Sequence, residues 1–385
     1  MNRLTTSQGQ YELARFPEDP RDTLRAWDAA DEYLLGHLQG AGDGEPVDLS
    51  GTVVVLGDRW GALATALAAH RPVQISDSHL GQQATRRNLA RNGVDAGAVR
   101  LLSTRDVPPD RIDALLVRVP KSLALLEDQL HRLAPALHAG SVVVGTGRVT
   151  EIHTSTLQLF ERLVGPTRTS LAVKKSRLIF ATPDPERVRP ANPWPHRYTL
   201  PGGLGAASGM AVTNHAGVFC AEHLDIGTRF LLEHLPRRTG AERVVDLGCG
   251  NGVVGTAAAL ANPASHVVFL DESHQAVASA EATFRANAPA SATGEFHVAD
   301  GMAEVPDGSV ELVLNNPPFH SHQATTDTTA RRMFAGARSA LRPGGELWVV
   351  GNRHLGYHVR LRRLFGNCEV VASNPKFVVL RAVKG

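Results

Sequence analysis

The sequence is poor in cysteine, in aromatic residues and in net charge, and each shortage narrows the possible function classes. The three cysteines, Cys220, Cys249 and Cys368, are not spaced as metal ligands and cannot all pair, so we expect no metal site and reduced thiols, as in a cytoplasmic protein. The net charge is only +2 in 385 residues. Nucleic-acid binding would therefore depend on local basic patches and not on a global positive field. No apolar run approaches the length that spans a bilayer, and we expect no membrane association.

Long blocks of apolar, β-branched residues are present, and they alternate with helical patterns. Such alternation is typical of mainly parallel sheets covered by helices on both faces. A proline-rich, aperiodic segment interrupts the pattern near the middle of the chain. Prolines lack a backbone N–H donor and favour extended backbone, so this segment reads as a linker. We therefore predict two Rossmann-like α/β domains, at residues 1–183 and 204–385, joined by a linker at 184–203.

The two halves of the chain resemble each other in four blocks that occur in the same order. The blocks align Gly57 with Gly248, Asp77 with Asp271, Pro120 with Pro318, and Gly140 with Gly344. Any two α/β domains share some strand-glycine-helix blocks by chance, but a conserved order of four favours a tandem duplication.

The stretch "RVVDLGCGNGVVG" has the form of a strand, a glycine-rich turn and the start of a helix. Gly248, Gly250 and Gly252 lack a Cβ atom, so the backbone can adopt positive φ and approach a ligand closely. The helix start then offers free N–H groups. With Asp246 in front, the spacing resembles motif I of class I S-adenosylmethionine-dependent methyltransferases more than a dinucleotide-binding fingerprint.

Acidic residues end the next two predicted strands. Asp271 follows "HVVFL" and could accept both hydroxyl groups of a cofactor ribose, although it could instead cap the following helix. Asp300 stands where methyltransferases of this class contact the adenine amino group, and the Asp300-Gly301 pair could equally form an ordinary turn.

The stretch "LVLNNPPFH" resembles the (Asn/Asp)-Pro-Pro-(Tyr/Phe) motif of amino-group methyltransferases. An amine conjugated to a purine ring is a poor nucleophile, because its lone pair is delocalised. The side chain of Asn316 and the carbonyl of Pro317 can accept hydrogen bonds from its two N–H groups, and proline rings hold that carbonyl in place. Phe319 offers a face for an extruded base to stack on. His320 could contact the substrate or accept a proton.

Other candidate substrate contacts lie outside these motifs. Phe219 precedes an amphipathic helix predicted at Asp225–His234, with Ile226, Phe230 and Leu231 on one face. The resemblance to methyltransferases with the Asn-Pro-Pro-Phe motif implies that an aromatic residue such as Phe219 lies near the target base. In the first half, the loop "LGDRWGA" has lost a glycine, and "VRVPKS" has neither the asparagine nor the aromatic residue. That half instead carries basic residues, which we expect to contact RNA phosphates unless they form only a solvated face. They are Arg86, Arg87, Lys121, Lys174 and Lys175.

These blocks together resemble bacterial ribosomal RNA guanine-N2 methyltransferases with duplicated domains. "VDLGCGNGV" and "NNPPF" are shared by both branches of that family, whereas "IHTSTLQLFERLVGPT" and "HQATTD" favour the large-subunit branch. The resemblance implies two class I methyltransferase domains with mainly parallel seven-stranded sheets. The first would be degenerate and recognise RNA. The second would transfer a methyl group from S-adenosyl-L-methionine to N2 of a guanine in 23S rRNA, either naked or in an assembly intermediate. We expect a cytoplasmic monomer.

Several alternatives remain open at this point. The acceptor could be a guanine of small-subunit rRNA, an adenine N6 or a protein glutamine amide, since similar motifs serve those reactions. The chain could also be a non-catalytic RNA-binding assembly factor, although a domain without chemistry need not keep Asn316 and the glycine loop. An NAD-dependent oxidoreductase would need a hydride-transfer partner that the sequence does not show.

Overall fold

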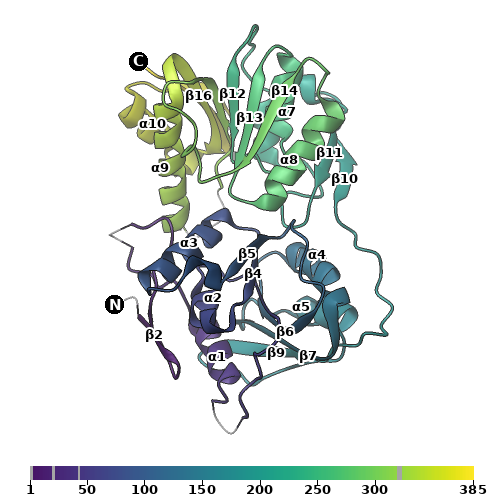
Figure 1. The fold of residues 1–385 in the computed structure, drawn as a ribbon. Helices are drawn as coiled ribbons and strands as arrows, with labels where there is room; N and C mark the ends of the chain where they lie inside the picture. The colour runs from purple at the N-terminus through teal and green to yellow at the C-terminus, as the bar shows by residue number, and fades with distance from the viewer. Residues whose placement is uncertain (1–2, 20–21, 42–43, 319–322) are drawn as a thin grey trace. The chain divides into compact units, whose positions relative to one another are not determined.

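The computed structural model describes residues 3–19, 22–41, 44–318 and 323–385, with the backbone alone at 323–327. The chain forms two compact units, Met1–Pro193 and Trp194–Gly385 (Figure 1). Within the described ranges, no helix combines the length and the apolar character that crossing a membrane requires.

The first unit is built on a seven-stranded sheet with the order β5-β4-β3-β6-β7-β9-β8. Its strands are β3 (Val53–Leu56), β4 (Val73–Ser76), β5 (Arg100–Ser103), β6 (Ile112–Arg118), β7 (Leu137–Arg148), β8 (Thr167–Thr169) and β9 (Ser176–Ala181). Neighbouring strands from β5 to β7 are parallel, and β9 is antiparallel to both β7 and β8. A separate antiparallel hairpin of β1 (Arg3–Thr6) and β2 (Gly9–Glu12) precedes the sheet.

Helices cover both faces of this first sheet. The α-helices are α1 (Ala29–Leu38), α2 (Ala62–Ala66), α3 (His79–Arg91), α4 (Leu123–Leu133) and α5 (Thr154–Leu163). Short 3₁₀ turns are η1 (Ala68–His70), η2 (Ala96–Ala98) and η3 (Ala134–Ala136). Side chains of α1 and α2 pack on one face of the sheet, and those of α4 and α5 pack on the other. Because both faces are covered, β3 at the centre of the sheet is apolar at every position, with the sequence "VVVL".

The second unit repeats this architecture, with the strand order β14-β13-β12-β15-β16-β18-β17. Its sheet contains β12 (Arg243–Leu247), β13 (His266–Asp271), β14 (Thr293–Val298), β15 (Val310–Asn315), β16 (Leu341–Asn352), β17 (Glu369–Ser373) and β18 (Phe377–Val383). Again β18 runs antiparallel to both of its neighbours, and the other pairs are parallel. The hairpin of β10 (His196–Thr199) and β11 (Ala211–Asn214) precedes the sheet.

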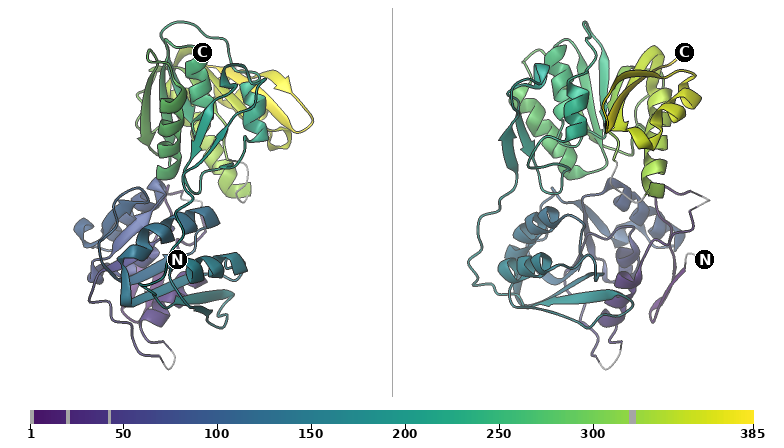
Figure 2. Two further views of the ribbon diagram at one scale, coloured as in Figure 1. Left: turned by 90° about the vertical axis from the view of Figure 1, so that its right-hand side faces the viewer. Right: turned by 180° about the vertical axis from the view of Figure 1, so that it is seen from behind.

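Helices also sandwich the second sheet, as the views in Figure 2 show. They are α6 (Ile226–Leu232), α7 (Val253–Ala261), α8 (His274–Asn287), α9 (Gln323–Ala340) and α10 (Tyr357–Phe365), with 3₁₀ turns η4 (Gly205–Ala207) and η5 (Arg353–Leu355). Successive residues of strand β12 point to opposite faces of the sheet. Val244 belongs to the core under α6, α7 and α8, whereas Val245 and Leu247 belong to the core under α9 and α10. Two tandem Rossmann-like domains with mainly parallel seven-stranded sheets are thereby confirmed.

The strand registers define which residues of the two units are equivalent. Leu56, just before the first loop glycine, lies opposite Val117. Its counterpart at the end of β12 lies opposite Asn315. The next residues along the two strands, Arg118 and Asn316, are therefore equivalent, as the alignment of the two proline motifs predicted.

One pairing in the predicted alignment is wrong by one residue. In the first unit Val54 pairs with Val73, and in the second unit its equivalent Val245 pairs with Val268. Val73 and Val268 are therefore equivalent. Ser76, and not Asp77, is therefore the counterpart of Asp271. The error arose because an aspartate stands near the end of both strands. We aligned the two aspartates with each other and did not follow the register of the apolar residues before them.

Residues 196–199, which we assigned to the linker, form strand β10 of the second unit. The prolines of the linker segment end at Pro195 and resume at Pro201, so the five residues between have the backbone donors that pairing requires. They pair antiparallel with β11, and Tyr198 packs against the small apolar cluster that includes Leu200 and Val212.

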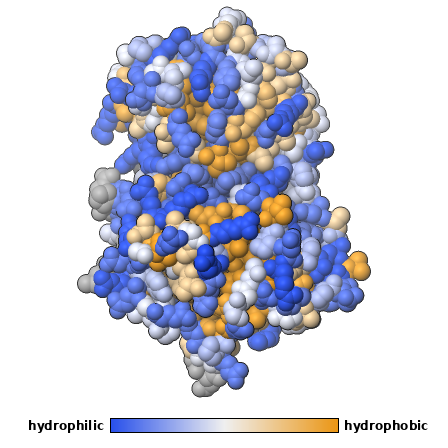
Figure 3. All heavy atoms as spheres, in the orientation of Figure 1, coloured by the Kyte–Doolittle hydropathy of each residue, from blue (hydrophilic) through white to orange (hydrophobic). Residues whose placement is uncertain are grey.

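Figure 3 shows hydrophilic side chains over most of one face of the molecule, with apolar ones between them. The most exposed large apolar side chains are Leu171 and Val188, at 87% and 93% exposure, and they lie in irregular segments of the first unit. Scattered exposed apolar residues of this kind are normal for a globular protein.

Candidate active site

The predicted motifs of the second unit meet at the carboxyl ends of β12 and β15. The chain leaves β12 toward β13 on one side and returns to β15 on the other, so these two strands flank the topological switch point at which open α/β sheets bind ligands. The side-chain Nδ2 of Asn315 donates to the carbonyl of Leu247 at 2.6 Å. This bond ties the end of β15 directly to the start of the glycine loop.

All three loop glycines adopt the positive φ that the sequence predicted. The φ angles of Gly248, Gly250 and Gly252 are 72°, 52° and 74°. A Cβ atom on Gly252 would lie 2.6 Å from the Cα of Ala280, so this glycine lets α7 approach α8 closely. At Gly250, no atom of the described residues lies within 4 Å of the Cβ position. Gly250 therefore borders open space, whereas Gly252 serves packing.

We predict that alanine has opposite consequences at these two glycines. Gly252→Ala should destabilise the second unit by more than about 2 kcal/mol, because the strain of a left-handed alanine, about 1–2 kcal/mol, adds to a backbone clash. Gly250→Ala carries only the strain, but it should weaken cofactor binding at least about tenfold by filling the open space. Urea unfolding and calorimetric titration check the pair. Equal loss of stability in both variants would contradict this division of roles.

Asp246 and Asp271 both hold the glycine loop in place. Asp246 is 3% exposed, and its Oδ2 accepts from the backbone N–H of Gly255 at 2.8 Å. Burial raises the pKa of Asp246 to about 8. Asp271 accepts from the N–H of Gly250 at 3.0 Å and from that of Ser273 at 3.0 Å. The side chain that caps helix α8 is Ser273, so Asp271 stands beside the loop, where a ribose-binding residue is expected.

Asp300 lies in the turn after β14, and its carboxylate is engaged within the protein. Both of its oxygens accept from Nη2 of Arg332 on α9. A contact from Asp300 to an adenine amino group stays a prediction, and it would have to share the carboxylate with Arg332.

The side chain of Asn316 is held at one end. Its Nδ2 donates to Oγ1 of Thr228 at 2.9 Å and to Oδ2 of Asp225 at 3.4 Å. Its Oδ1 is buried and has no hydrogen-bond partner among the residues that the structure describes. A buried acceptor without a partner is unfavourable by about 1–3 kcal/mol, so this oxygen is prepared to receive a donor. Pro317 is buried, and the predicted site residues Phe319 and His320 lie outside the described residues.

The predicted amphipathic helix exists as α6, with Asp225 as its N-cap. Leu231 is fully buried, but Ile226 is 59% exposed, so its assignment to the apolar face was wrong. Ile226 is the first residue of a short helix, and the buried stripe is formed from Gly227, Leu231 and Leu232. Phe219 precedes the helix and is 51% exposed, and its contact with a base stays a prediction.

The basic residues predicted to contact RNA are exposed, as such a role requires. Arg86 and Arg87 lie on α3, where the guanidinium of Arg87 stacks 4.6 Å from the ring of Phe16. Lys121 follows β6. Lys174 and Lys175 form a tight turn with positive φ at both residues.

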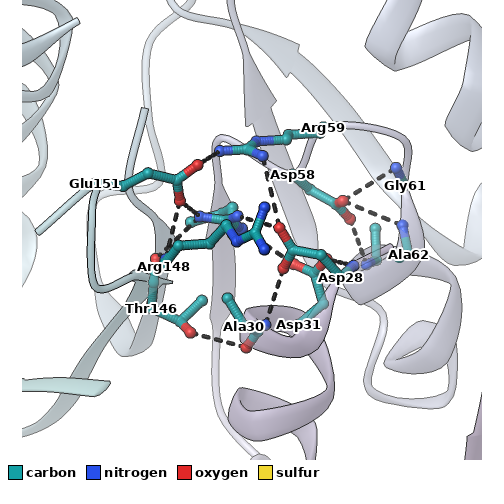
Figure 4. Close-up of polar contacts among 12 residues, drawn as sticks. Asp28, Ala30, Asp31, Asp58, Arg59, Gly61, Ala62, Thr146, Arg148 and Glu151 are labelled. Carbon is teal, nitrogen blue, oxygen red and sulfur yellow. Dashed lines mark hydrogen bonds and ion pairs between the residues drawn. The ribbon is translucent and has the colours of Figure 1, made fainter. Parts of the chain in front are cut away.

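The equivalent site of the first unit is filled by its own side chains. Arg118, in the position of Asn316, is fully buried, and its Nη1 and Nη2 donate to Glu151 and Asp28, each at 2.9 Å. Its Nε lies 3.3 Å from Asp31. Arg59 extends from the loop to the same Glu151 at 2.7 Å. Figure 4 shows how these carboxylates converge from α1 and from the turn after β7.

The glycine loop of the first unit is closed in a similar way. The carboxylate of Asp58 accepts from the backbone N–H groups of Gly61, Ala62 and Ala64 at 2.9–3.1 Å (Figure 4). These are the donors that a helix start would otherwise offer to a ligand. In the second unit, the equivalent N–H groups of Gly252 and Gly255 donate to the carbonyl of Cys249 and to Asp246, so the two loops bind these groups with different acceptors.

Sequence reasoning missed Thr228, Asp225 and Arg332 as members of the site. An aspartate three residues before a threonine, ahead of an apolar run, is an ordinary helix-start signal, and it points to no chemistry. The available signal was internal: "DAADEYLL" from Asp28 and "DIGTRFLL" from Asp225 align with each other. The alignment of the two halves did not include these stretches.

Both halves of the chain match models of known protein families. Residues 1–185 match the family model described as RLMG N-terminal domain, and residues 209–381 match the Methyltransferase small domain model. A solved structure, described as the T. thermophilus 16S rRNA N2 G1207 methyltransferase in complex with AdoMet and guanosine, aligns with a TM-score of 0.76. The alignment covers 100% of this chain and 97% of that one at 20% sequence identity, and it shows a common two-unit fold.

Curated relatives are much more similar in sequence. The chain is 49% identical to the Ribosomal RNA large subunit methyltransferase G of Pseudomonas paraeruginosa, over 100% of both chains. It is 72% identical to the protein of the same name from Streptomyces griseus, again over 100% of both chains. With this identity over the full length, the chain belongs to the ribosomal RNA large subunit methyltransferase G family.

Proposed function

We propose that this protein transfers a methyl group from S-adenosyl-L-methionine to the exocyclic N2 of a guanine in large-subunit ribosomal RNA. The proposal rests on the buried Oδ1 of Asn316, which has no hydrogen-bond partner among the described residues and lies at the end of a strand that is tied to the glycine loop. The choice of rRNA follows the names of the relatives, and the choice of guanine N2 follows the resemblance of the motifs.

The residues at the glycine loop fit such a cofactor. Gly250 leaves open space at its Cβ position, and the start of α7 lies directly beyond the loop. Asp271 lies beside the loop and can accept ribose hydroxyls. The bound cofactor would supply an electrophilic methyl group on a sulfonium.

The chain itself contributes mainly positioning. We infer that Oδ1 of Asn316 and the carbonyl of Pro317 each accept one N–H of the target amine, which turns the nitrogen lone pair toward the incoming methyl group. Correct orientation at close range can supply a large part of the rate of such a reaction. A methylated amino nitrogen is cationic and strongly acidic until it loses a proton, so no strong general base is needed.

The first unit is assigned a role in RNA recognition. Its buried Arg118 occupies the position of the proposed catalytic asparagine, whereas its basic side chains at Lys121 and Lys175 are exposed. Such side chains bind phosphates without reading sequence. We place the protein in the cytoplasm, where ribosomal RNA is modified, and expect it to act as a monomer on naked rRNA or on an assembly intermediate.

Nucleoside mapping by mass spectrometry tests the proposal. Ribosomal RNA from cells that lack the enzyme is incubated with the protein and S-adenosylmethionine labelled in its methyl group. We expect label in N2-methylguanosine of the large-subunit RNA. Label in small-subunit RNA, in N6-methyladenosine or in ribosomal protein would identify one of the alternative acceptors. No label in any fraction would contradict an enzymatic role.

A further inference from the structure

We propose that Thr228 and Asp225 are positioning residues for Asn316. They fix which end of its side-chain amide faces the substrate, so that Oδ1 and not Nδ2 meets the target amine. This inference deepens the proposed function and rests on it for its kinetic consequences. The arrangement of the amide itself can be tested without any substrate.

The hydrogen bonds of the three side chains permit one orientation of the amide. A carboxylate can only accept, so Asp225 requires a donor from each neighbour. The hydroxyl of Thr228 donates its single proton to Oδ2 of Asp225 at 3.2 Å. It therefore turns a lone pair toward Asn316 and accepts from Nδ2 at 2.9 Å. A rotated amide would bring Oδ1 toward the carboxylate of Asp225, and it could receive the proton of Thr228 only if that hydroxyl gave up its bond to Asp225.

The distances from Nδ2 of Asn316 indicate that Thr228 and Asp225 have different roles. At 2.9 Å, the bond from Asn316 to Thr228 is of ordinary strength, whereas the contact to Asp225 at 3.4 Å is long and weak. Thr228 therefore holds the amide directly. Asp225 acts mainly by fixing the direction of the Thr228 hydroxyl.

The two residues are themselves held firmly by the start of α6. The Oδ2 atom of Asp225 accepts from the backbone N–H of Thr228 at 2.8 Å and caps the helix. Gly227, between them, packs so that an added Cβ would lie 3.2 Å from the ring of Phe377 on β18. Leu231, one turn further along, is fully buried. The side-chain amide of Asn316 is thus held in place by a helix that packs on the sheet, and not by a surface loop.

The first unit contains the same three-residue arrangement with different chemistry. Asp28 caps α1 as Asp225 caps α6, and Asp31 stands three residues later, in the position of Thr228. Both contact Arg118, which the strand register matches with Asn316. The same contact thus occurs in both copies of the duplicated fold. It joins a threonine to an asparagine in the unit where the reaction is proposed, and charged residues in the other unit. The repetition supports a specific structural role for this contact.

Thr228→Val tests the direct contact. Valine keeps the shape of threonine and removes both the acceptor for Asn316 and the donor for Asp225. We expect kcat to fall about 10- to 100-fold, because about 90–99% of the population would no longer present Oδ1 to the substrate. The KM for S-adenosylmethionine should stay within about twofold. Thr228→Ser restores the hydroxyl and should restore kcat.

Thr156→Val is the matched control. Thr156 also stands three residues after a helix cap, and its hydroxyl accepts from the backbone N–H of His153 in the first unit. Its loss should lower stability as Thr228→Val does and leave kcat unchanged. Asp225→Asn is the second test. Asparagine caps helices as well as aspartate does, but its NH2 group can donate to a rotated Asn316, so we expect kcat to fall although the helix is preserved.

The amide can also be observed directly. In protein labelled with ¹⁵N-asparagine, the side-chain NH2 signal of Asn316 is assigned by its absence in Asn316→Ala. We expect Thr228→Val to shift this signal and to accelerate its hydrogen exchange. An unshifted signal, full kcat in Thr228→Val, or equal losses in the valine and serine variants would each overturn the positioning role. If the wild-type protein methylates no RNA but the signal responds as expected, the proposed function fails while the arrangement of the amide stands.

Discussion

Replacing Asn316 by alanine should lower kcat for RNA methylation by about 10²- to 10³-fold or more. Removing one preorganised hydrogen-bonding group at a reaction centre typically has an effect of this size. Here the loss is double, because the variant has neither the unpaired Oδ1 that would receive the target amine nor the Nδ2 that anchors the side chain to Thr228. Single-turnover methylation of rRNA, measured with saturating cofactor, gives the rate of the chemical step.

Cofactor affinity should change little in Asn316→Ala. The groups assigned to the cofactor belong to the glycine loop and the end of β13, and Asn316 donates to neither. We expect a dissociation constant within about threefold of the wild-type value by calorimetry. Such a split between binding and rate indicates an interaction made mainly in the transition state.

Asn367→Ala is a suitable control for Asn316→Ala. Asn367 lies in the same unit, and its amide bridges both backbone groups of Val383, each at 2.8 Å. Its loss should reduce stability without changing the rate. Asn316→Asp adds a stricter comparison, because it supplies acceptors but no donor for Thr228 and sets a second carboxylate near Asp225. Full activity in Asn316→Ala would refute the assigned role, whereas full activity in Asn316→Asp would show that the bond to Thr228 is not needed.

Replacing Arg118 by alanine should destabilise the first unit by about 3–5 kcal/mol. Removing one partner of a buried ion-pair network leaves the other charges without compensation, and losses of this size are typical. Arg118 is fully buried and faces Asp28, Asp31 and Glu151. Desolvation opposes ionisation of Glu151, but Arg118 and Arg59 outweigh it and lower the pKa of Glu151 to about 2.

Urea unfolding, combined with hydrogen exchange of the backbone amides of β6, β7 and α1, checks this prediction. Arg162→Ala is the control. Arg162 pairs with Glu127 on the surface and is half exposed, and such pairs contribute about 0–1 kcal/mol. If Arg118→Ala were as mild as Arg162→Ala, water would have to replace the lost guanidinium, and the network would not be the central support that its burial indicates.

The fold and the loop conformation could be predicted from the sequence because they depend on local patterns. Apolar runs bounded by glycine turns indicate parallel strands, and Gly248, Gly250 and Gly252 permit positive φ because glycine has no Cβ atom. The order of the blocks then predicted that Arg118 and Asn316 occupy the same place in the two sheets.

Contacts between distant segments could not be predicted in the same way. The bond between Asn316 and Thr228 joins residues that are 88 positions apart, and nothing near either residue signals the other. The pairing of Asp300 with Arg332 is of the same kind. The exposure of Ile226 was misjudged because a helical pattern does not show where a seven-residue helix begins to pack. Periodicity predicts elements, whereas polar partners depend on how those elements assemble.

The charge network of the first unit also makes the divergence of the two copies difficult to reverse. A change of Arg118 back to asparagine, alone, would leave Asp31 without its cation and would leave Arg59 as the cation that faces Asp28 and Glu151. Introducing arginine at residue 316 would meet one carboxylate and a hydroxyl instead of that acidic set. Each single step between the two arrangements passes through a destabilised protein. The duplicated sites are therefore separated by an epistatic barrier, and selection for folding alone is enough to keep the first copy from recovering its ancestor's chemistry.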